Sequence, residues 1–282
     1  AFNPWAQSTG GATSFKIKKR SQSTVFCSYS PLESVPDQIL LSNYQQCSWV
    51  LYTLQVVKMN PGAFLFSYFL YNFNMLIRIL TTAPNLGTGL IIFALVASAL
   101  VLSLSIHEFA HAFIADKLGD PTAKMLGRVT LDPRAHLDTT GTILLLIAGF
   151  GWGKPVPVNE SNLSSPKRDS ALISFAGPLS NILLALLFAG SYHLFGLSSG
   201  LLGKFVWLVV YYNILLAIFN LLPVNPLDGF KVVNGILPKE LSYQWMQMAP
   251  YGIWILLLLV FTGVIDRIIY PTIRIFLGFL QL

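Results

Sequence analysis

Residues 86–111, LGTGLIIFALVASALVLSLSIHEFAH, decide the fold of this chain. No residue between Arg78 and His107 carries a charge. About 20 apolar residues in a row are enough for a helix to cross the hydrocarbon core of a bilayer. The stretch therefore predicts a transmembrane helix, and His107 and Glu108 follow directly where its apolar run ends.

The composition of the whole chain supports a membrane protein. Apolar residues make up 54% of the 282 residues and charged residues only 11%, whereas roughly a quarter of the residues of a soluble protein are charged. Mean hydropathy is +0.62. These values exclude a disordered chain, which needs low hydrophobicity and high charge. The net charge of +6 is scattered along the chain, so we expect a lipid bilayer as the surroundings and no nucleic acid as a partner.

Further charge-free windows predict an all-α polytopic membrane protein. Two other apolar segments are either interfacial helices or additional spans, so about four to six transmembrane helices are expected. The predicted spans after the first are Leu179–Leu197, Phe205–Leu222 and Tyr251–Val264, and the two open segments are Ala63–Leu80 and Ile268–Leu282.

A segment near the expected site is too short to cross the membrane. Thr142–Phe150 is apolar but runs into a stretch rich in glycine and proline, which opposes a continuing helix. We expect a re-entrant or β-hairpin segment here. Arg128–Leu131 and Lys154–Val158 are candidates for its short strands.

Basic loop residues predict the orientation. They follow the first and third predicted spans and precede the second, and lysine and arginine mark the cytoplasmic side of a membrane. We therefore expect a bacterial inner-membrane protein whose active site faces the cytoplasm.

Residues 1–74 differ from the rest, and we expect an N-terminal extension before a core domain at 75–282. The first 32 residues contain no acidic side chain but several serines, threonines and a basic run at Lys16–Arg20. This composition resembles an organellar transit peptide, which would place the protein in a plastid membrane. The alternatives are an unstructured extension, or sequence upstream of a start at Met75.

His107-Glu108-Phe109-Ala110-His111 is an H-E-x-x-H motif. Residues four apart lie on one face of a helix, so both imidazoles can reach one metal ion. Glu108 is then placed to act as a general base toward water at the metal. The alternative is that both histidines merely cap a span at the water interface, but this leaves an acid in the last membrane turn unexplained.

A catalytic zinc needs one more protein ligand than these two histidines. Asp228 is a candidate because it follows the third span in Asn220–Gly229, NLLPVNPLDG. The two prolines break the helix there, and irregular backbone at membrane depth is tolerated where it lines a site. The alternative is a helix stop at the membrane surface with Asp228 solvated.

Together these residues resemble the site-2 protease family of intramembrane zinc metalloproteases, peptidase family M50. The motifs that carry the resemblance, which runs from about Met75 to about Val264, are HEFAH, Asn220-x-x-Pro223, Leu227-Asp228-Gly229, GRVTLDP at 127–133 with His136, GWGKPVPVN at 151–159 and AGPLSN at 176–181. The spacing resembles the compact bacterial-type members, which lack a PDZ insert. One departure is Asn225, where the family usually has proline.

The resemblance implies a role for each matched position. His107, His111 and Asp228 would bind one Zn²⁺ per chain, Glu108 would activate water, and Asn220 would hold the scissile peptide or its oxyanion. His136 is a possible second-shell residue, with a plain interfacial histidine as the alternative. The implied substrate is a transmembrane protein, and the motifs leave the oligomeric state open.

The sequence leaves two other functions open. A membrane metal transporter would also place histidine and aspartate at membrane depth, but its ligands are more often spread over several spans. A catalytically inactive relative that binds membrane partners would have no need for all four key positions, which are intact.

Overall fold

The computed structural model describes residues 13–18, 24–29, 79, 83–148, 153–197 and 200–282, and the chain divides into two compact units, Ala1–Phe66 and Ser67–Leu282. In the first unit, strands β1 (Thr13–Lys18) and β2 (Thr24–Tyr29) pair antiparallel, with Thr13 opposite Tyr29. The expected boundary at residues 74 and 75 lies outside the described residues, as does nearly all of Ala63–Leu80.

The second unit is helical, and its described part confirms the predicted all-α polytopic membrane protein. Among the residues that the structure describes, four helical segments are long and apolar enough to cross a membrane. Three are the single helices α4 (Leu86–Lys117), α8 (Pro166–Leu194) and α9 (Gly200–Asn220). The fourth, Lys239–Phe261, is made of α11 (Lys239–Met246), the 3₁₀ turn η2 (Ala249–Tyr251) and α12 (Gly252–Phe261).

Shorter elements connect and follow these spans. They are α5 (Thr122–Met125), α6 (Pro133–His136), α7 (Thr139–Ala148), the 3₁₀ turn η1 (Glu160–Asn162), α10 (Asp228–Ile236) and α13 (Val264–Phe279). The apolar tail predicted over Ile268–Leu282 is thus largely helical, within α13.

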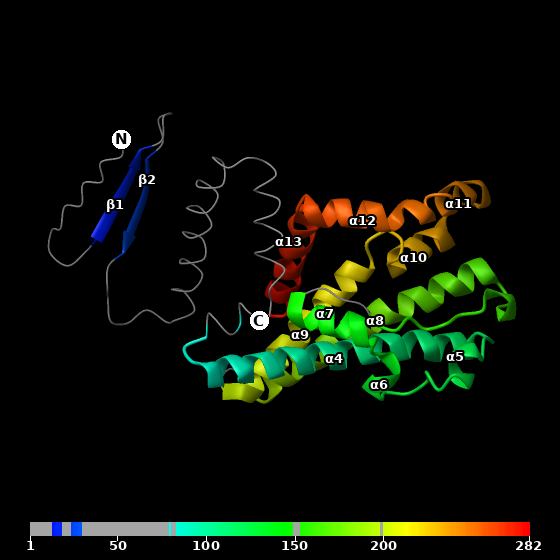
Figure 1. The fold of residues 1–282 in the computed structure, drawn as a ribbon, viewed down its shortest axis with the longest axis horizontal. Helices are drawn as coiled ribbons and strands as arrows, with labels where there is room; N and C mark the ends of the chain where they lie inside the picture. Colours follow the sequence, from blue (N-terminus) through cyan, green and yellow to red (C-terminus); the bar gives the residue numbers. More distant parts are fainter. Residues whose placement is uncertain (1–12, 19–23, 30–78, 80–82, 149–152, 198–199) are drawn as a thin grey trace. The chain divides into compact units, whose positions relative to one another are not determined.

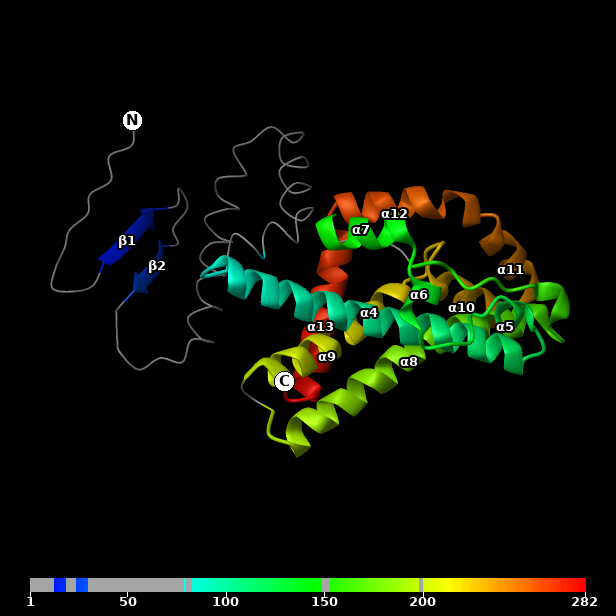
Figure 2. The same ribbon diagram turned by 60° about the horizontal axis from the view of Figure 1, so that its bottom comes forward.

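Helix α8 is the centre of the arrangement. It packs against α4, α9 and α10, while α4 and α13 also pack on α9 (Figures 1 and 2). Ala185 and Ala189 of α8 are buried against Val210 and Ile214 of α9. Small residues such as these let membrane helices approach closely.

Two helix ends near the site differ from the ends predicted from the sequence. Helix α4 continues past its apolar run to Lys117, so HEFAH lies inside a helix rather than at its end. Helix α8 begins at Pro166, and Gly177-Pro178 lies in its interior. Pro178 has no N–H for a helical bond, yet the helix is continuous through it.

The described part of the segment expected to be re-entrant or a β-hairpin is mainly helical. Residues 139–148 form α7, residues 149–152 lie outside the described part, and Gly153 makes an isolated antiparallel bridge with Leu137. Neither Arg128–Leu131 nor Lys154–Val158 is a strand. The prolines in the second segment lack N–H donors, and the Arg128 side chain donates to the carbonyls of Lys154 and Pro155.

Asp120 fastens the loops at the end of α4. Its buried carboxylate accepts hydrogen bonds from the Thr122 N–H (3.1 Å) and hydroxyl (2.5 Å), the Asn159 N–H (2.7 Å) and the Asn162 amide (2.7 Å). Burial by itself raises the pKa of Asp120, but these donors outweigh burial and lower the pKa below its usual value. The carboxylate thus joins the loop after α4 to the loop before α8.

We predict that Asp120→Asn lowers the stability of the helical unit by about 1–3 kcal/mol at neutral pH, because charge-assisted hydrogen bonds are lost. A carboxyl whose folded pKa is depressed contributes stability above its unfolded pKa, near 4, and loses it as pH falls through the folded pKa. Thermal unfolding in detergent should therefore show the gap between parent and variant closing in acid. A gap that stays constant down to low pH would contradict this account.

Candidate metal centre

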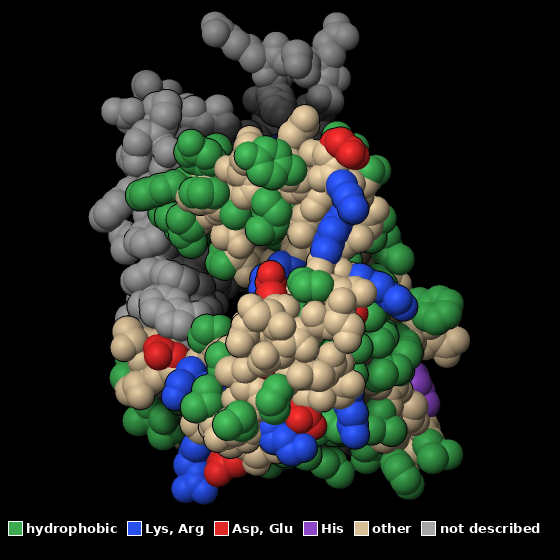
Figure 3. Space-filling view, turned by 90° about the vertical axis from the view of Figure 1, so that its right-hand side faces the viewer, with side chains coloured by type: hydrophobic (Ala, Val, Ile, Leu, Met, Phe, Trp, Pro, Cys, Tyr) green, Lys and Arg blue, Asp and Glu red, His purple; other side chains and the backbone are tan. Residues whose placement is uncertain are grey.

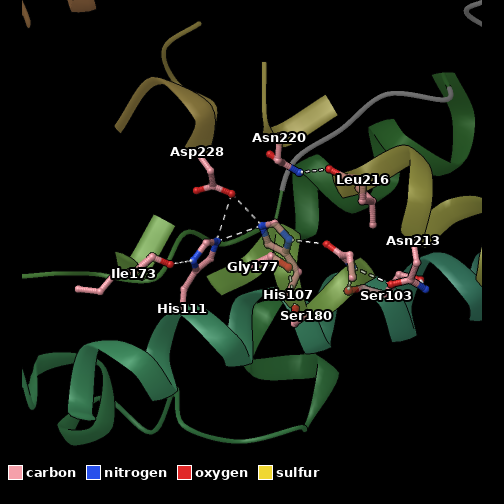
Figure 4. Close-up of polar contacts among 11 residues, drawn as sticks. Ser103, His107, His111, Ile173, Gly177, Ser180, Asn213, Leu216, Asn220 and Asp228 are labelled. Atoms are coloured by element: carbon pink, nitrogen blue, oxygen red, sulfur yellow. Dashed lines mark hydrogen bonds and ion pairs between the residues drawn. The ribbon is translucent and has the colours of Figure 1, made fainter. Parts of the chain in front are cut away.

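The helical spacing of HEFAH brings both histidines to one side of α4. His107 and His111 are 4% and 8% exposed, and their Nε2 atoms lie 3.0 Å apart (Figure 4). The rings meet edge to face with centroids 4.6 Å apart. Two imidazoles in this arrangement direct their Nε2 atoms toward one point.

Asp228 reaches the same point from α10. Its Oδ2 lies 3.2 Å from His107 Nε2 and 3.3 Å from His111 Nε2 (Figure 4). The side chain is only 18% exposed. The structure therefore brings the three residues singled out in the sequence into one group whose ligand atoms lie within 4.8 Å of one another.

The irregular segment between α9 and α10 is what delivers Asp228. It contains a cis peptide bond before Pro226, and the Asn225 side chain donates to the Ala249 carbonyl at 3.0 Å, which ties the turn to η2. A side chain on Gly229 would collide with the backbone of Leu221. Asn225, the position that departs from the family pattern, thus anchors the turn by a side-chain bond.

The hydrogen bonds on the far side of each ring decide what the Nε2 atoms can do. His111 Nδ1 lies 2.7 Å from the Ile173 backbone carbonyl, and His107 Nδ1 lies 2.6 Å from Asn181 Oδ1. Both partners are acceptors, so both Nδ1 atoms carry the proton, and a neutral imidazole then presents a lone pair at Nε2.

Two lone pairs and a carboxylate oxygen therefore face one another in a buried space. With both imidazoles neutral and no cation present this arrangement is repulsive, whereas a borderline-soft metal such as zinc takes imidazole nitrogen and carboxylate oxygen ligands together. The donor set fits zinc and leaves a further coordination position open to water or substrate.

Gly177 provides the room for the two rings. A Cβ at this position would lie 2.5 Å from His111 Nε2 and 2.6 Å from His107 Cε1. The backbone of α8 thus touches both imidazoles directly, which only glycine allows. Next to it, Pro178 is fully buried.

Glu108 is half-buried, and its carboxylate lies beside Gly153. A Cβ on Gly153 would stand 3.5 Å from Glu108 Oε1 and 3.2 Å from the His136 carbonyl. Within the described residues no hydrogen bond or ion pair occupies the Glu108 carboxylate. Burial lowers the pKa of nearby Arg128, and the negative charge of Glu108 offsets part of that effect.

Asn220 and His136 lie outside the three-residue group. Asn220 is the last residue of α9, and its amide donates to the Leu216 carbonyl at 3.0 Å (Figure 4). His136 is fully buried, and its Nε2 donates to the Thr130 carbonyl at 2.7 Å. The backbone carbonyl of His136 accepts a hydrogen bond from the Lys154 N–H. This carbonyl, and not the imidazole, borders the region of Gly153 and Glu108.

Two residues of the site carry no role in the sequence interpretation. Gly177 and Asn181 both belong to the segment AGPLSN at 176–181, which takes part in the family resemblance only as a motif. The motif could have marked this segment as part of the site. The contacts to His107 and His111 could not be found from it, because they depend on how α8 crosses α4.

Comparisons with known proteins identify the family of the chain. The sequence model of peptidase family M50 matches residues 196–261. The protein named "Putative zinc metalloprotease YwhC" from Bacillus subtilis is 40% identical over 183 residues, which are 61% of this chain and 82% of that protein. "Putative zinc metalloprotease Rip2" from Mycobacterium tuberculosis is 34% identical over 156 residues, 53% of this chain and 60% of that protein. No solved structure matches the chain.

The chain therefore belongs to the site-2 protease family of zinc metalloproteases, peptidase family M50. The expected fold class and enzyme class are confirmed, and a zinc protease with this apolar helical bundle is a membrane protein.

We predict that Gly177→Ala prevents zinc binding, because the added methyl group would occupy the space of the two imidazoles. Metal analysis of the purified protein should show zinc falling from about one ion per chain to well below half. Gly190→Ala is the matched control, since it lies on the same helix and its Cβ would meet nothing within 4 Å. Full zinc content in Gly177→Ala would contradict the geometry described for the rings.

Proposed function

We propose that this protein is an intramembrane zinc endopeptidase that hydrolyses peptide bonds in or near transmembrane segments of membrane proteins. One zinc ion per chain would be held by His107, His111 and Asp228. The observation that carries the proposal is the convergence of two imidazole lone pairs and a carboxylate inside an apolar bundle. Ionisable groups at this depth are costly unless a partner or a metal compensates them.

A zinc ion held by these three residues would supply Lewis-acid chemistry, polarising a carbonyl group and lowering the pKa of a water molecule to about 7. The protein supplies the remaining groups. Glu108 is one residue from His107 on α4 and its carboxylate has no other partner among the described residues. It would take a proton from the attacking water and pass it to the leaving amine.

Asn220 would stabilise the oxyanion of the tetrahedral intermediate. It ends α9 where the irregular segment leading to Asp228 begins. Its amide nitrogen uses one N–H in the bond to Leu216, and the second N–H is available to a substrate. Donors aimed at a developing negative charge are often the largest single contribution to catalysis.

The depth of the site supports a transmembrane substrate. His107 and His111 lie in a helix whose apolar run precedes them directly. A transmembrane helix satisfies its backbone internally, so the substrate must unwind locally before its peptide bond can be attacked. We propose a segment of a membrane protein, surrounded by the bilayer, as the partner.

Exposed basic side chains support an active site toward the cytoplasm. Figure 3 views the end of the bundle where α4 ends and α8 begins, and lysine and arginine side chains are spread over it. The exposed basic residues at the end of α4, in α5, before and at the start of α8, in α10 and at the start of α11 are Lys117, Lys124, Lys154, Arg168, Lys231 and Lys239. Under the positive-inside rule this end is cytoplasmic, and we propose the bacterial inner membrane as the location.

The central test is Glu108→Gln. Loss of the base should lower cleavage of a model transmembrane substrate in detergent by about 10²–10⁴-fold, while zinc content stays at that of the parent. A chelator should abolish the parent's cleavage, and added zinc should restore it. Glu240→Gln, at an exposed glutamate on α11, is the matched control and should cleave like the parent.

Two results would refute the proposal. Cleavage by Glu108→Gln at the parent's rate would show that Glu108 is not the general base. Zinc bound by a parent that cleaves no transmembrane substrate yet transports zinc across vesicles would instead identify a metal transporter.

We also predict that Asn220→Ala lowers kcat by about 10²–10³-fold while KM changes little, because the amide would act on the transition state rather than on the bound substrate. Steady-state cleavage kinetics measure the two constants separately. Gln244→Ala, which removes an exposed amide of α11, serves as the comparison and should keep both constants. An Asn220→Ala variant that raises KM alone would show that Asn220 binds the ground state only.

A further inference from the structure

A chain of buried polar side chains runs from the metal group into the middle of the bundle. Ser103 on α4, Asn181 on α8 and Asn213 on α9 are each fully buried. Polar side chains in such surroundings are costly unless every group is hydrogen-bonded, and membrane helices seldom keep them without a function. All three are connected to His107 by hydrogen bonds.

The Asn213 amide, at the end of this series of hydrogen bonds, has a fixed orientation. The Asn213 amide nitrogen donates to the Val209 carbonyl and to the Ser103 hydroxyl, both at 2.7 Å. The Ser103 hydroxyl in turn donates to the Ala99 carbonyl at 2.7 Å. Backbone carbonyls can only accept, so they determine which way Asn213 is turned, and its oxygen points to α8.

The orientation of the Asn213 amide in turn determines that of Asn181. Its amide nitrogen donates to Asn213 Oδ1 at 2.7 Å and to the Ser103 carbonyl at 3.2 Å. Its oxygen therefore faces His107 Nδ1, at 2.6 Å. A flipped Asn181 would place an N–H₂ group against the protonated Nδ1 and an oxygen against two acceptors.

We propose that Asn181, Asn213 and Ser103 are positioning residues of the metal centre, which hold the proton on His107 Nδ1 and so keep the lone pair of Nε2 directed at the metal. This inference rests on the proposed zinc site. Asn181 acts on His107 directly, while Asn213 and Ser103 act through Asn181. These hydrogen-bonded side chains come from α4, α8 and α9, so the packing of the three helices also affects the orientation of His107.

The two histidines differ in this respect. His111 Nδ1 is held by a backbone carbonyl, that of Ile173, which needs no support because it cannot donate. His107 depends on a side-chain amide, which can be turned either way. Only for His107 does the orientation have to be enforced, and the buried chain provides this.

The experiment measures zinc affinity by competition with a chelator, for the parent and for Asn181→Leu and Asn213→Leu. Leucine keeps a similar volume but has no hydrogen-bonding group. Asn181→Leu should weaken zinc binding by about 10–100-fold, the usual effect of losing a ligand's outer partner. Asn213→Leu should weaken it less, by about tenfold, and should add little in the Asn181→Leu background because the two act in series.

Two further variants separate orientation from packing. Asn181→Asp keeps an acceptor at His107 Nδ1, and as the neutral acid, which burial favours, its O–H can still donate to Asn213 Oδ1, so its zinc affinity should stay within about threefold of the parent's. Ser105→Ala removes another buried serine of α4, which only donates to the Val101 carbonyl, and should leave zinc affinity unchanged. Thermal unfolding of the zinc-free proteins controls for loss of folding.

The outcomes are distinct. Weak zinc binding by the leucine variants with rescue by Asn181→Asp supports the proposal. Parental affinity in both leucine variants, additive losses in the double variant, or an Asn181→Asp affinity as low as that of Asn181→Leu would overturn it. A parent chain that binds no zinc would overturn the proposed function itself, which the first measurement of the series reveals.

Discussion

The structure depends on one constraint, which is that two imidazoles and a carboxylate share a buried space within an apolar bundle. His107, His111 and Asp228 place their ligand atoms 3.0–3.3 Å apart, a separation that like-polarity atoms tolerate only around a cation. Because water cannot compensate these groups at membrane depth, the surrounding helices have to do so. The close approach of α8 at Gly177, the broken segment before α10 and the buried amides all follow from that requirement.

A regular helix and an irregular turn each position part of the metal site. Helix α4 fixes the two histidines relative to each other through its own periodicity. Asp228 begins α10 directly after a turn that prolines keep out of a helix, and Asn225 fastens this turn to η2. A site built in this way is set by the packing of α4, α8 and α10 as much as by its ligands, so substitutions at Gly177 or Gly229, which bind nothing, are expected to affect it strongly.

The sequence predicts the parts that are local. HEFAH carries its own geometry because helical spacing fixes the distance between His107 and His111. Long apolar windows locate the spans, although the second and fourth begin at Pro166 and Lys239, well before the predicted starts. Other parts depend on contacts between distant segments. Asn181 and His107 are 74 residues apart, and the strands expected over Arg128–Leu131 and Lys154–Val158 are absent because the Arg128 side chain binds the carbonyls that a strand pairing would use.

The most direct test of this account is the zinc K-edge X-ray absorption spectrum of the purified protein. The account predicts one zinc per chain with low-atomic-number ligands at about 2.0–2.1 Å and the multiple-scattering signature of two imidazoles. Loss of one oxygen ligand in Asp228→Ala, with the imidazole signal kept, would complete the assignment. A sulfur shell at about 2.3 Å, or a spectrum with no imidazole signal, would contradict a centre made of His107, His111 and Asp228.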